Sequence, residues 1–254
     1  MISSLFVCHG GPTLVVEKNE YTSFLKDLGK RLKPKAIVVF TAHWESNVTT
    51  ISSIEGTYDM IYDFYGFPKA LYTKKYPAKG SVELASKLKK LLNDNGIESR
   101  LDKSRGLDHG SWDFLYLMYP NADIPVVQVS INPFLPMDKQ YEIGKALRAL
   151  GEEDILVIGS GSTVHNLSTI DWEAENVESW ALEFDNWLIE KVENNDTKSL
   201  FNYRNLAKNS EKAIPREEHI VPMFIAMGSG NKIKPKLLHH SYVYGTLSYI
   251  CFEF

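Results

Sequence analysis

Cysteine and long apolar runs are both scarce in this sequence of 254 residues, whose only cysteines are Cys8 and Cys251. Two cysteines cannot form a cysteine-rich zinc site, and a cytosolic chain would keep them reduced. The longest apolar runs, 36–40 and 222–227, are far shorter than the ~20 residues that a membrane-spanning helix needs. No basic region precedes the apolar residues 2–8, so no secretory signal is expected. We therefore expect a cytoplasmic protein.

Excess positive charge is absent as well. The chain has 28 Lys and Arg residues against 32 Asp and Glu residues, a net charge of −4, and no basic stripe. This pattern disfavours nucleic acid as a partner. Hydrophobic residues make up 44% and charged residues 24%, close to globular averages. Because repeats and low-complexity linkers are also lacking, we predict one domain over residues 1–254, with the segments 194–210 and 228–235 as surface connections.

Short apolar, β-branched runs alternate with longer segments of helical periodicity. The runs 5–8, 36–42, 125–131 and 154–159 predict strands of a sheet that is covered on both faces. Apolar spacing predicts helices over 21–32, 84–92, 138–150 and 177–192, and a short helix that begins at Pro222. A further strand region, 242–254, is broken at Gly245. The alternation predicts an α/β fold, a three-layer sandwich around a largely parallel or mixed central sheet.

Histidines are the main candidates for carrying chemistry, and three of the seven follow predicted strands. His9 follows 5–8, His43 follows 36–42, and His165 follows 154–159 through a tight turn at 159–161. Ligands bind outside the carboxyl ends of the strands in an open parallel sheet, so these imidazoles can meet at one edge. His219 lies just before the helix at Pro222, and His109 lies in the glycine-flanked loop 106–112.

Two other histidines and Cys8 are expected to have structural roles, and the role of one aromatic segment stays open. His239 and His240 lie in a polar segment that is predicted to be a loop, and no chemistry is expected of them. Cys8 precedes His9 on one strand, so the two side chains point to opposite faces and Cys8 is expected to be buried. The segment 62–68 is dense in aromatic rings, which are typical both of a core that covers the sheet and of a mouth for a flat aromatic substrate.

Several motifs in order along the chain carry a resemblance to a known family. They are 9–13 (HGGPT), 41–45 (TAHWE), 62–68 (YDFYGFP), 106–112 (GLDHGSW), 125–131 (PVVQVSI), 164–167 (VHNL) and 218–219 (EH). Together they span nearly the whole chain. On these motifs the sequence resembles the class III extradiol ring-cleavage dioxygenases, in the DOPA 4,5-dioxygenase-like branch.

The resemblance implies a single non-haem divalent metal held by His9, His43 and His219. It places His165 beside the metal as an acid or base, although some descriptions of the branch count this residue among the ligands. It places His109 facing the substrate. Members use Fe²⁺ for ring opening and some bacterial members hold Zn²⁺, so both metals stay open.

The third metal ligand has a second candidate. More distant class III enzymes use two histidines and a glutamate, the pattern typical of Fe²⁺ oxygenases, and Glu218 precedes His219 here. The branch that the sequence resembles points to His219, and three histidines are also a common zinc arrangement. If the aromatic segment forms the mouth of the site, Tyr62, Phe64 and Phe67 are the expected substrate-binding residues.

The reaction implied by the resemblance is insertion of both oxygen atoms of O₂ beside a diol. It would open a DOPA-like catechol to a muconic semialdehyde, with a small aromatic diol and O₂ as partners and with neither nucleic acid nor membrane. Histidine suits the proton transfers because its ordinary pKa lies near 7. Two alternatives remain: a zinc hydrolase that uses Glu45 or Glu218 to activate water, and a non-catalytic Memo-like binding protein. The oligomeric state cannot be read from the sequence.

Overall fold

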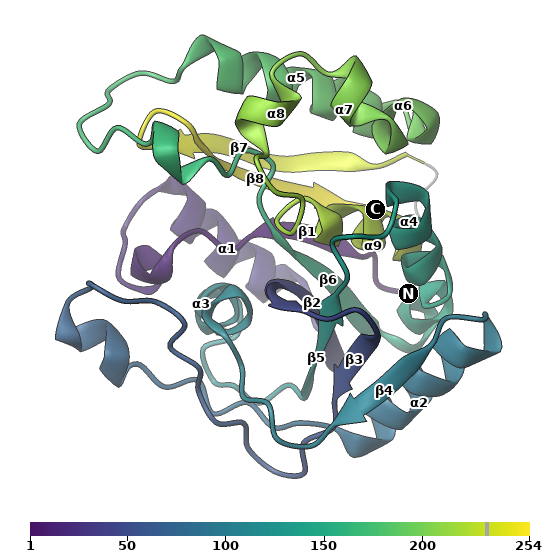
Figure 1. The fold of residues 1–254 in the computed structure, drawn as a ribbon. Helices are drawn as coiled ribbons and strands as arrows, with labels where there is room; N and C mark the ends of the chain where they lie inside the picture. Colours follow the sequence, from purple (N-terminus) through teal and green to yellow (C-terminus); the bar gives the residue numbers. More distant parts are fainter. Residues whose placement is uncertain (232–233) are drawn as a thin grey trace.

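The strands of the described chain form one mixed sheet in the order β4-β3-β5-β2-β6-β1-β8-β7 (Figure 1). This computed structural model describes residues 1–231 and 234–254. The strands are β1 (Leu5–Cys8), β2 (Ala36–Glu45), β3 (Thr49–Ser52), β4 (Ser99–Asp102), β5 (Val126–Ile131), β6 (Ile155–Gly161), β7 (Lys236–Val243) and β8 (Leu247–Glu253). The central pairs β5–β2, β2–β6 and β6–β1 are parallel, whereas β8 pairs antiparallel with both β1 and β7. The predicted mixed α/β sheet is confirmed.

Alternation along the strands explains why both faces of the sheet are covered. Phe6 and Val38 belong to one buried cluster and their neighbours Val7 and Val39 to another, as the two-residue period of a strand requires. The first cluster includes side chains of α2 (Val82–Asp94), α4 (Met137–Lys145), α5 (Ser179–Glu193) and α9 (Val221–Ser229). The second includes α1 (Glu20–Arg31) and α3 (His109–Met118). These helices form the two outer layers of the sandwich (Figure 1).

Several expectations about individual elements were wrong. The helix expected over 138–150 ends at Lys145 and is followed by the 3₁₀ segment Arg148–Glu153. The segment 194–210 is largely helical, with α6 (Thr197–Phe201) and α7 (Tyr203–Leu206), and it buries Leu200 and Tyr203. His239 and His240 lie in β7 rather than in a loop. Pairing with β8 provides the backbone hydrogen bonds of this polar segment, and its local sequence gave no sign of that pairing. Two residues of the predicted connection 228–235, namely 232–233, lie outside the described residues.

The short elements complete the chain. They are the 3₁₀ segments Pro12–Val15, Lys69–Thr73 and Leu167–Thr169 and the helix α8 (Ser210–Ala213). The break expected at Gly245 is confirmed, since Tyr244 and Gly245 both have positive φ in the turn that joins β7 to β8. None of the helices in the described part of the chain has the length and apolar character needed to cross a membrane.

Glycines at the end of β6 let the segment before α9 approach the sheet. The predicted tight turn at 159–161 is wrong, because these residues continue the strand. A Cβ atom on Gly159 would lie 2.0 Å from the carbonyl oxygen of Pro222, and one on Gly161 would lie 2.0 Å from that of His219. The absence of both side chains is therefore what admits His219 to the edge of the sheet.

The close approach of α9 predicts the outcome of a single substitution. Gly159→Ala should lower the free energy of unfolding by about 1–3 kcal/mol, because the added methyl group must displace backbone atoms. Gly11→Ala is a suitable control, since its Cβ would meet nothing within 4 Å and its φ of −104° suits alanine. Denaturant unfolding measures both effects. Equal stability of the two variants would contradict the tight packing described here.

Candidate metal centre

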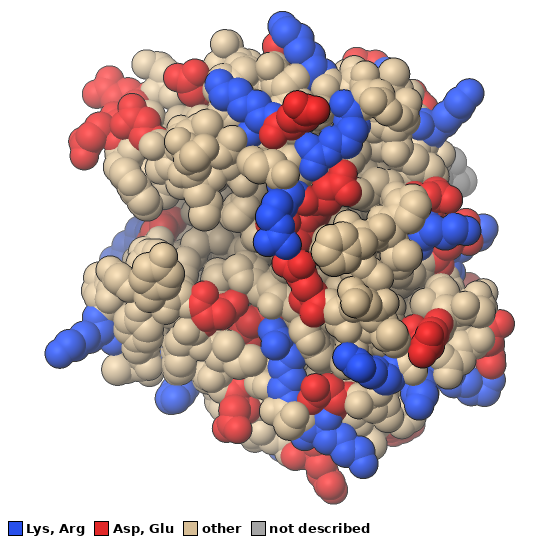
Figure 2. Space-filling view, viewed as in Figure 1, with Lys and Arg blue, Asp and Glu red and all other residues tan. Residues whose placement is uncertain are grey.

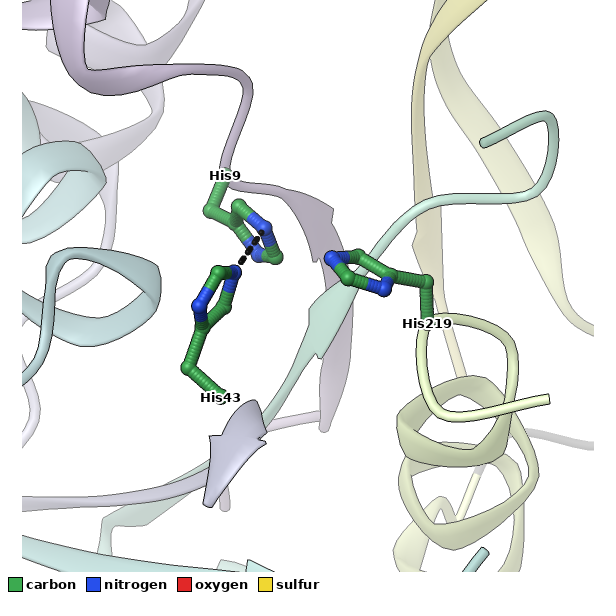
Figure 3. Close-up of side chains that lie close together, drawn as sticks. All are labelled: His9, His43 and His219. Atoms are coloured by element: carbon green, nitrogen blue, oxygen red, sulfur yellow. Dashed lines mark hydrogen bonds between the residues drawn. The ribbon is translucent and has the colours of Figure 1, made fainter. Parts of the chain in front are cut away.

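Three histidines from distant parts of the chain meet at the carboxyl edge of the central strands (Figure 3). His9 directly follows β1, His43 lies near the end of β2, and His219 lies just before α9. One ring nitrogen from each lies within 4.8 Å of the other two. The Nε2 atoms of His9 and His43 are 3.2 Å apart. The sheet thus brings together the three residues that the sequence singled out as ligands.

The tautomer of His9 follows from a buried hydrogen-bond chain. The Ser160 hydroxyl donates to the carbonyl oxygen of Gly110, so its single hydrogen is used. Nδ1 of His9 lies 2.9 Å from the Ser160 oxygen and must therefore donate to it. The neutral ring consequently has its lone pair on Nε2, which faces His43.

Carboxylates orient the other two rings in the same way. Nδ1 of His43 lies 2.9 Å from a carboxylate oxygen of Asp63, and Nδ1 of His219 lies 3.0 Å from one of Glu218. An ionised carboxylate only accepts hydrogen bonds, so each Nδ1 carries a proton. Nε2 of His43 lies within hydrogen-bond distance of Nε2 of His9 (Figure 3). Nε2 of His219 is buried and has no hydrogen-bond partner among the described residues. Leaving a buried nitrogen without a partner is costly, and a metal ion is one partner that removes this cost.

This arrangement fits a metal ion. Imidazole nitrogens at about 2.0–2.1 Å from a tetrahedral zinc lie roughly 3.3 Å from one another, close to the separation of the His9 and His43 nitrogens. Metal-binding histidines also usually donate their second ring N–H to a carboxylate or another oxygen acceptor, as all three do here. Glu218 stands behind His219 as such an acceptor.

The pKa values of two of the three histidines, His9 and His219, favour the neutral ring, which is the form that can bind a metal. Burial, reinforced by the neighbouring imidazoles, lowers the pKa of His9 and of His219 well below the ordinary histidine value. Burial also acts to lower the pKa of His43, but the hydrogen bond to Asp63 and nearby carboxylates outweigh it, and the pKa is raised. A neutral imidazole is the form that binds a metal.

Asp63 joins the metal centre to His109, and sequence reasoning missed it. One oxygen of its carboxylate accepts from the ring and backbone N–H of His109, at 2.7 and 3.0 Å, while the other faces His43. Burial acts to raise the pKa of Asp63, but its hydrogen bonds to His109 and His43 dominate and lower it. The only signal in the sequence was the position of Asp63 within 62–68, where the aromatic residues drew attention.

His165 lies against His219 rather than in line with the three converging nitrogens. The two rings are stacked, with centroids 3.5 Å apart and planes 13° apart. Burial and the neighbouring His43 and His109 lower the pKa of His165 to about 4. Because its ring nitrogens make no hydrogen bond within the described residues, neutral His165 is free to accept a proton.

A cavity of about 480 Å³ opens beside the histidines. His9, His43, His109 and His165 line its inner end, and Phe64 and Phe67 form part of its wall. The ring-lined mouth is thus the better description of this part of the aromatic segment. Tyr62, which was expected to join them, does not line the cavity, because its hydroxyl donates to the carbonyl oxygen of Lys74 behind the wall. Cys8 is buried as expected, and burial raises its pKa to about 12.

The carboxylates proposed for a hydrolase are already engaged. Both oxygens of Glu45 lie 2.9 Å from the guanidinium of Arg216. Glu218 accepts from His219, and its second oxygen lies 3.5 Å from Arg216. Glu45 is therefore not placed as a free base for activating a water molecule, whereas the second oxygen of Glu218 is buried without a hydrogen-bond partner among the described residues.

The family described as "Catalytic LigB subunit of aromatic ring-opening dioxygenase" matches residues 6–254, and the chain belongs to this family. The resemblance inferred from the motifs is confirmed.

Curated relatives extend over nearly the whole chain. A "4,5-DOPA dioxygenase extradiol" of Beta vulgaris is 39% identical over 257 residues, which cover 99% of this chain and 96% of the relative. The protein of the same name from Escherichia coli (strain K12) is 39% identical over 238 residues, which cover 91% of this chain and 86% of the relative. The crystal structure of an uncharacterized protein from Escherichia coli K12 has a TM-score of 0.85 and 33% identity, and the match covers 100% of this chain and 99% of that one.

The metal content of variants tests whether the three converging histidines bind a metal. We expect His9→Ala, His43→Ala and His219→Ala each to lose most of the bound metal, because each removes one of three donors. Ser160→Ala should weaken metal affinity by about 10–100-fold, because it removes the acceptor that orients His9. His239→Ala, in β7, is the control and should keep the metal. Elemental analysis after anaerobic purification measures the metal content of all five variants. Full stoichiometric metal in the three variants that lack a proposed ligand would contradict the assignment.

Proposed function

We propose that this protein is a metal-dependent extradiol dioxygenase that opens a catechol ring with O₂ to a muconic semialdehyde. The observation that carries the proposal is the convergence of three Nε2 atoms whose rings are each held from behind by an acceptor. In this proposal His9, His43 and His219 hold one divalent metal, Fe²⁺ or Zn²⁺, within a single catalytic domain. When bound, a metal at this position supplies Lewis-acid binding of the diol and, as Fe²⁺, electron transfer.

His165 is the proposed proton carrier. Its low pKa keeps the ring neutral at pH 7, and one of its ring nitrogens takes the proton that a diol hydroxyl gives up. The same nitrogen returns a proton after ring opening. Stacking on His219 fixes the plane of the ring without using either nitrogen.

His109 is the proposed orienting group at the inner end of the cavity. Its Nδ1 donates to Asp63, and burial, which outweighs that bond, lowers its pKa. The neutral ring therefore presents Nε2 as an acceptor for the hydrogen of a substrate hydroxyl. Phe64 and Phe67 supply apolar faces for the substrate ring.

Oxygen consumption tests the proposed reaction. Protein loaded with Fe²⁺ under anaerobic conditions should consume one O₂ per catechol and give a product with the visible absorption of a ring-opened semialdehyde. His9→Ala, loaded in the same way, should consume none. Release of hydrogen peroxide or of an o-quinone as the main product would contradict extradiol cleavage.

Substitution of His165 should lower kcat without lowering the metal content. His165→Gln is expected to retain metal and lose ~10²–10⁴-fold in kcat, as removal of a general base typically does. In the unsubstituted protein, the acidic limb of the pH–rate profile should lie below pH 6.5, since a base of lowered pKa stays unprotonated as the pH falls. That limb should flatten in His165→Gln. If the variant emerges free of metal, His165 is a ligand and His109 becomes the better candidate for the base.

A further inference from the structure

His43 lies in the part of β2 where regular strand pairing stops. β2 pairs with β6 as far as Thr41, and its pairing with β5 is interrupted between Phe40 and Glu45. Such an irregularity redirects side chains, but it also removes the regular hydrogen bonds that hold the backbone of a strand. The position of His43 must therefore depend on other contacts.

Two side chains hold the backbone of His43 in place of a neighbouring strand. The backbone N–H of His43 donates to the hydroxyl oxygen of Thr41 at 3.2 Å. The carbonyl oxygen of His43 accepts from Nη2 of Arg105 at 3.1 Å. The guanidinium of Arg105 also lies 4.7 Å from the ring centroid of Trp44, so it contacts the next residue of the strand as well.

Both of these side chains bind the carboxylate of Asp108. The Thr41 hydroxyl donates to Oδ1 of Asp108 at 2.9 Å, and Nη2 of Arg105 donates to Oδ2 at 2.9 Å. The N–H and the carbonyl group of His43 are therefore connected to one carboxylate, each through a single side chain. Asp108 is the residue directly before His109, the first residue of α3.

The ion pair between Arg105 and Asp108 differs from the surface pairs of this protein. Figure 2 shows acidic and basic side chains next to one another over one face of the molecule, where solvent weakens their attraction. The side chains of Arg105 and Asp108 are only 23% and 0% exposed. Because a buried charge without its partner is strongly unfavourable, this pair is held in one geometry.

Asp108 occupies the N-cap position of α3 without capping the helix. An aspartate at this position usually accepts a hydrogen bond from a backbone N–H of the first turn. The side chain of Asp108 makes no such bond in the described chain, and its contact within the first turn is with the Ser111 hydroxyl, at 3.3 Å. The stability of α3 alone therefore does not explain why the carboxylate faces β2.

The network joins His43 to His109 from outside the cavity. The ring centroids of the two histidines are 4.1 Å apart. A Cβ atom on Gly110 would lie 2.7 Å from Cδ2 of His43, so the start of α3 packs directly against this ring. Neither Arg105 nor Asp108 is among the described residues that line the cavity. Any effect of this pair on a substrate must therefore pass through the two histidines.

We propose that Arg105 and Asp108 are positioning residues that fix the distance between the metal ligand His43 and the substrate-orienting His109. The proposal rests on the proposed dioxygenase function and adds two residues to its site. The physical reason is that β2 and α3 each carry one of the two groups that must act together on a substrate. A misplacement of about 1 Å between such groups lowers a rate by about 10²-fold.

Arg105→Met tests the proposal, because it removes the two hydrogen bonds and keeps an apolar chain beside Trp44. We expect kcat of the Fe²⁺-loaded protein to fall by about 10–100-fold and KM to change less than kcat, since no contact with the substrate is lost. Affinity for Co²⁺ should fall by about tenfold, and the visible absorption of bound Co²⁺ should shift because the ligand geometry changes.

Arg148→Met is the matched control. Arg148 is also a partly buried arginine that donates to a backbone carbonyl, that of Gly228, at 3.0 and 3.2 Å, but it lies outside the cavity wall. This variant should keep kcat, Co²⁺ affinity and the Co²⁺ spectrum. Equal values for Arg105→Met and Arg148→Met would overturn the proposal. A raised KM with unchanged kcat in Arg105→Met would assign Arg105 to substrate binding and would also overturn it.

A double-mutant comparison separates positioning from a general loss of stability. If Arg105 acts through His109, Arg105→Met should lower kcat much less in a His109→Gln background than in the unsubstituted protein. Equal fold losses in both backgrounds would show independent action and overturn the proposal. If Arg105→Met does not fold, Arg105→Lys replaces it, because lysine keeps the charge beside Asp108 but not the planar guanidinium. Full kcat in Arg105→Lys would then overturn the proposal.

The two proposals fail in distinguishable ways, because binding of Co²⁺ needs no turnover. If the unsubstituted protein opens no catechol, the proposed reaction is wrong, and the Co²⁺ affinity and spectrum of Arg105→Met still decide whether Arg105 positions His43. If catechol is opened and Arg105→Met behaves like Arg148→Met, the reaction stands and the positioning role is wrong.

Discussion

The convergence of three buried imidazoles depends on the hydrogen bond that each ring makes on its outer side. Ser160, Asp63 and Glu218 accept from the Nδ1 atoms of His9, His43 and His219, respectively. These acceptors orient the rings so that one nitrogen of each faces those of the other two in a buried site. Without a cation this is an unfavourable arrangement, and it is maintained because the sheet and α9 hold the backbone on both sides.

The same acceptors connect the metal centre to the groups proposed to handle protons. Asp63 serves His43 through one oxygen and His109 through the other, so the metal centre and the inner end of the cavity share one carboxylate. His165 is held by stacking rather than by hydrogen bonds to its ring. The cluster therefore separates three rings whose Nδ1 atoms are occupied from a fourth ring whose nitrogens make no hydrogen bond in the described chain. This difference suits the proposed division between metal binding and proton transfer.

Much of the fold and part of the site could be predicted from the sequence. Short continuous apolar runs and helical periodicity are local patterns, and they located most strands, the main helices and the strand-end positions of His9 and His43. Polar composition misled where tertiary contacts supply the stability. His239 lies in β7 because β8 pairs with it, and the segment 194–210 is helical around the buried Leu200 and Tyr203.

The sequence by itself determined which residue types lie at the ends of the strands, because strand and helix patterns involve residues that are neighbours in the chain. Only the tertiary structure decided which side chains meet. Gly161 admits His219 to the sheet edge from 58 residues away in the chain, and Ser160 meets His9 across 151 residues. The sequence did not single out Asp63 either, because its contacts with His43 and His109 also join distant parts of the chain. Such contacts depend on how β6, α9 and the loops pack, and packing of segments distant in the chain leaves no local pattern to read.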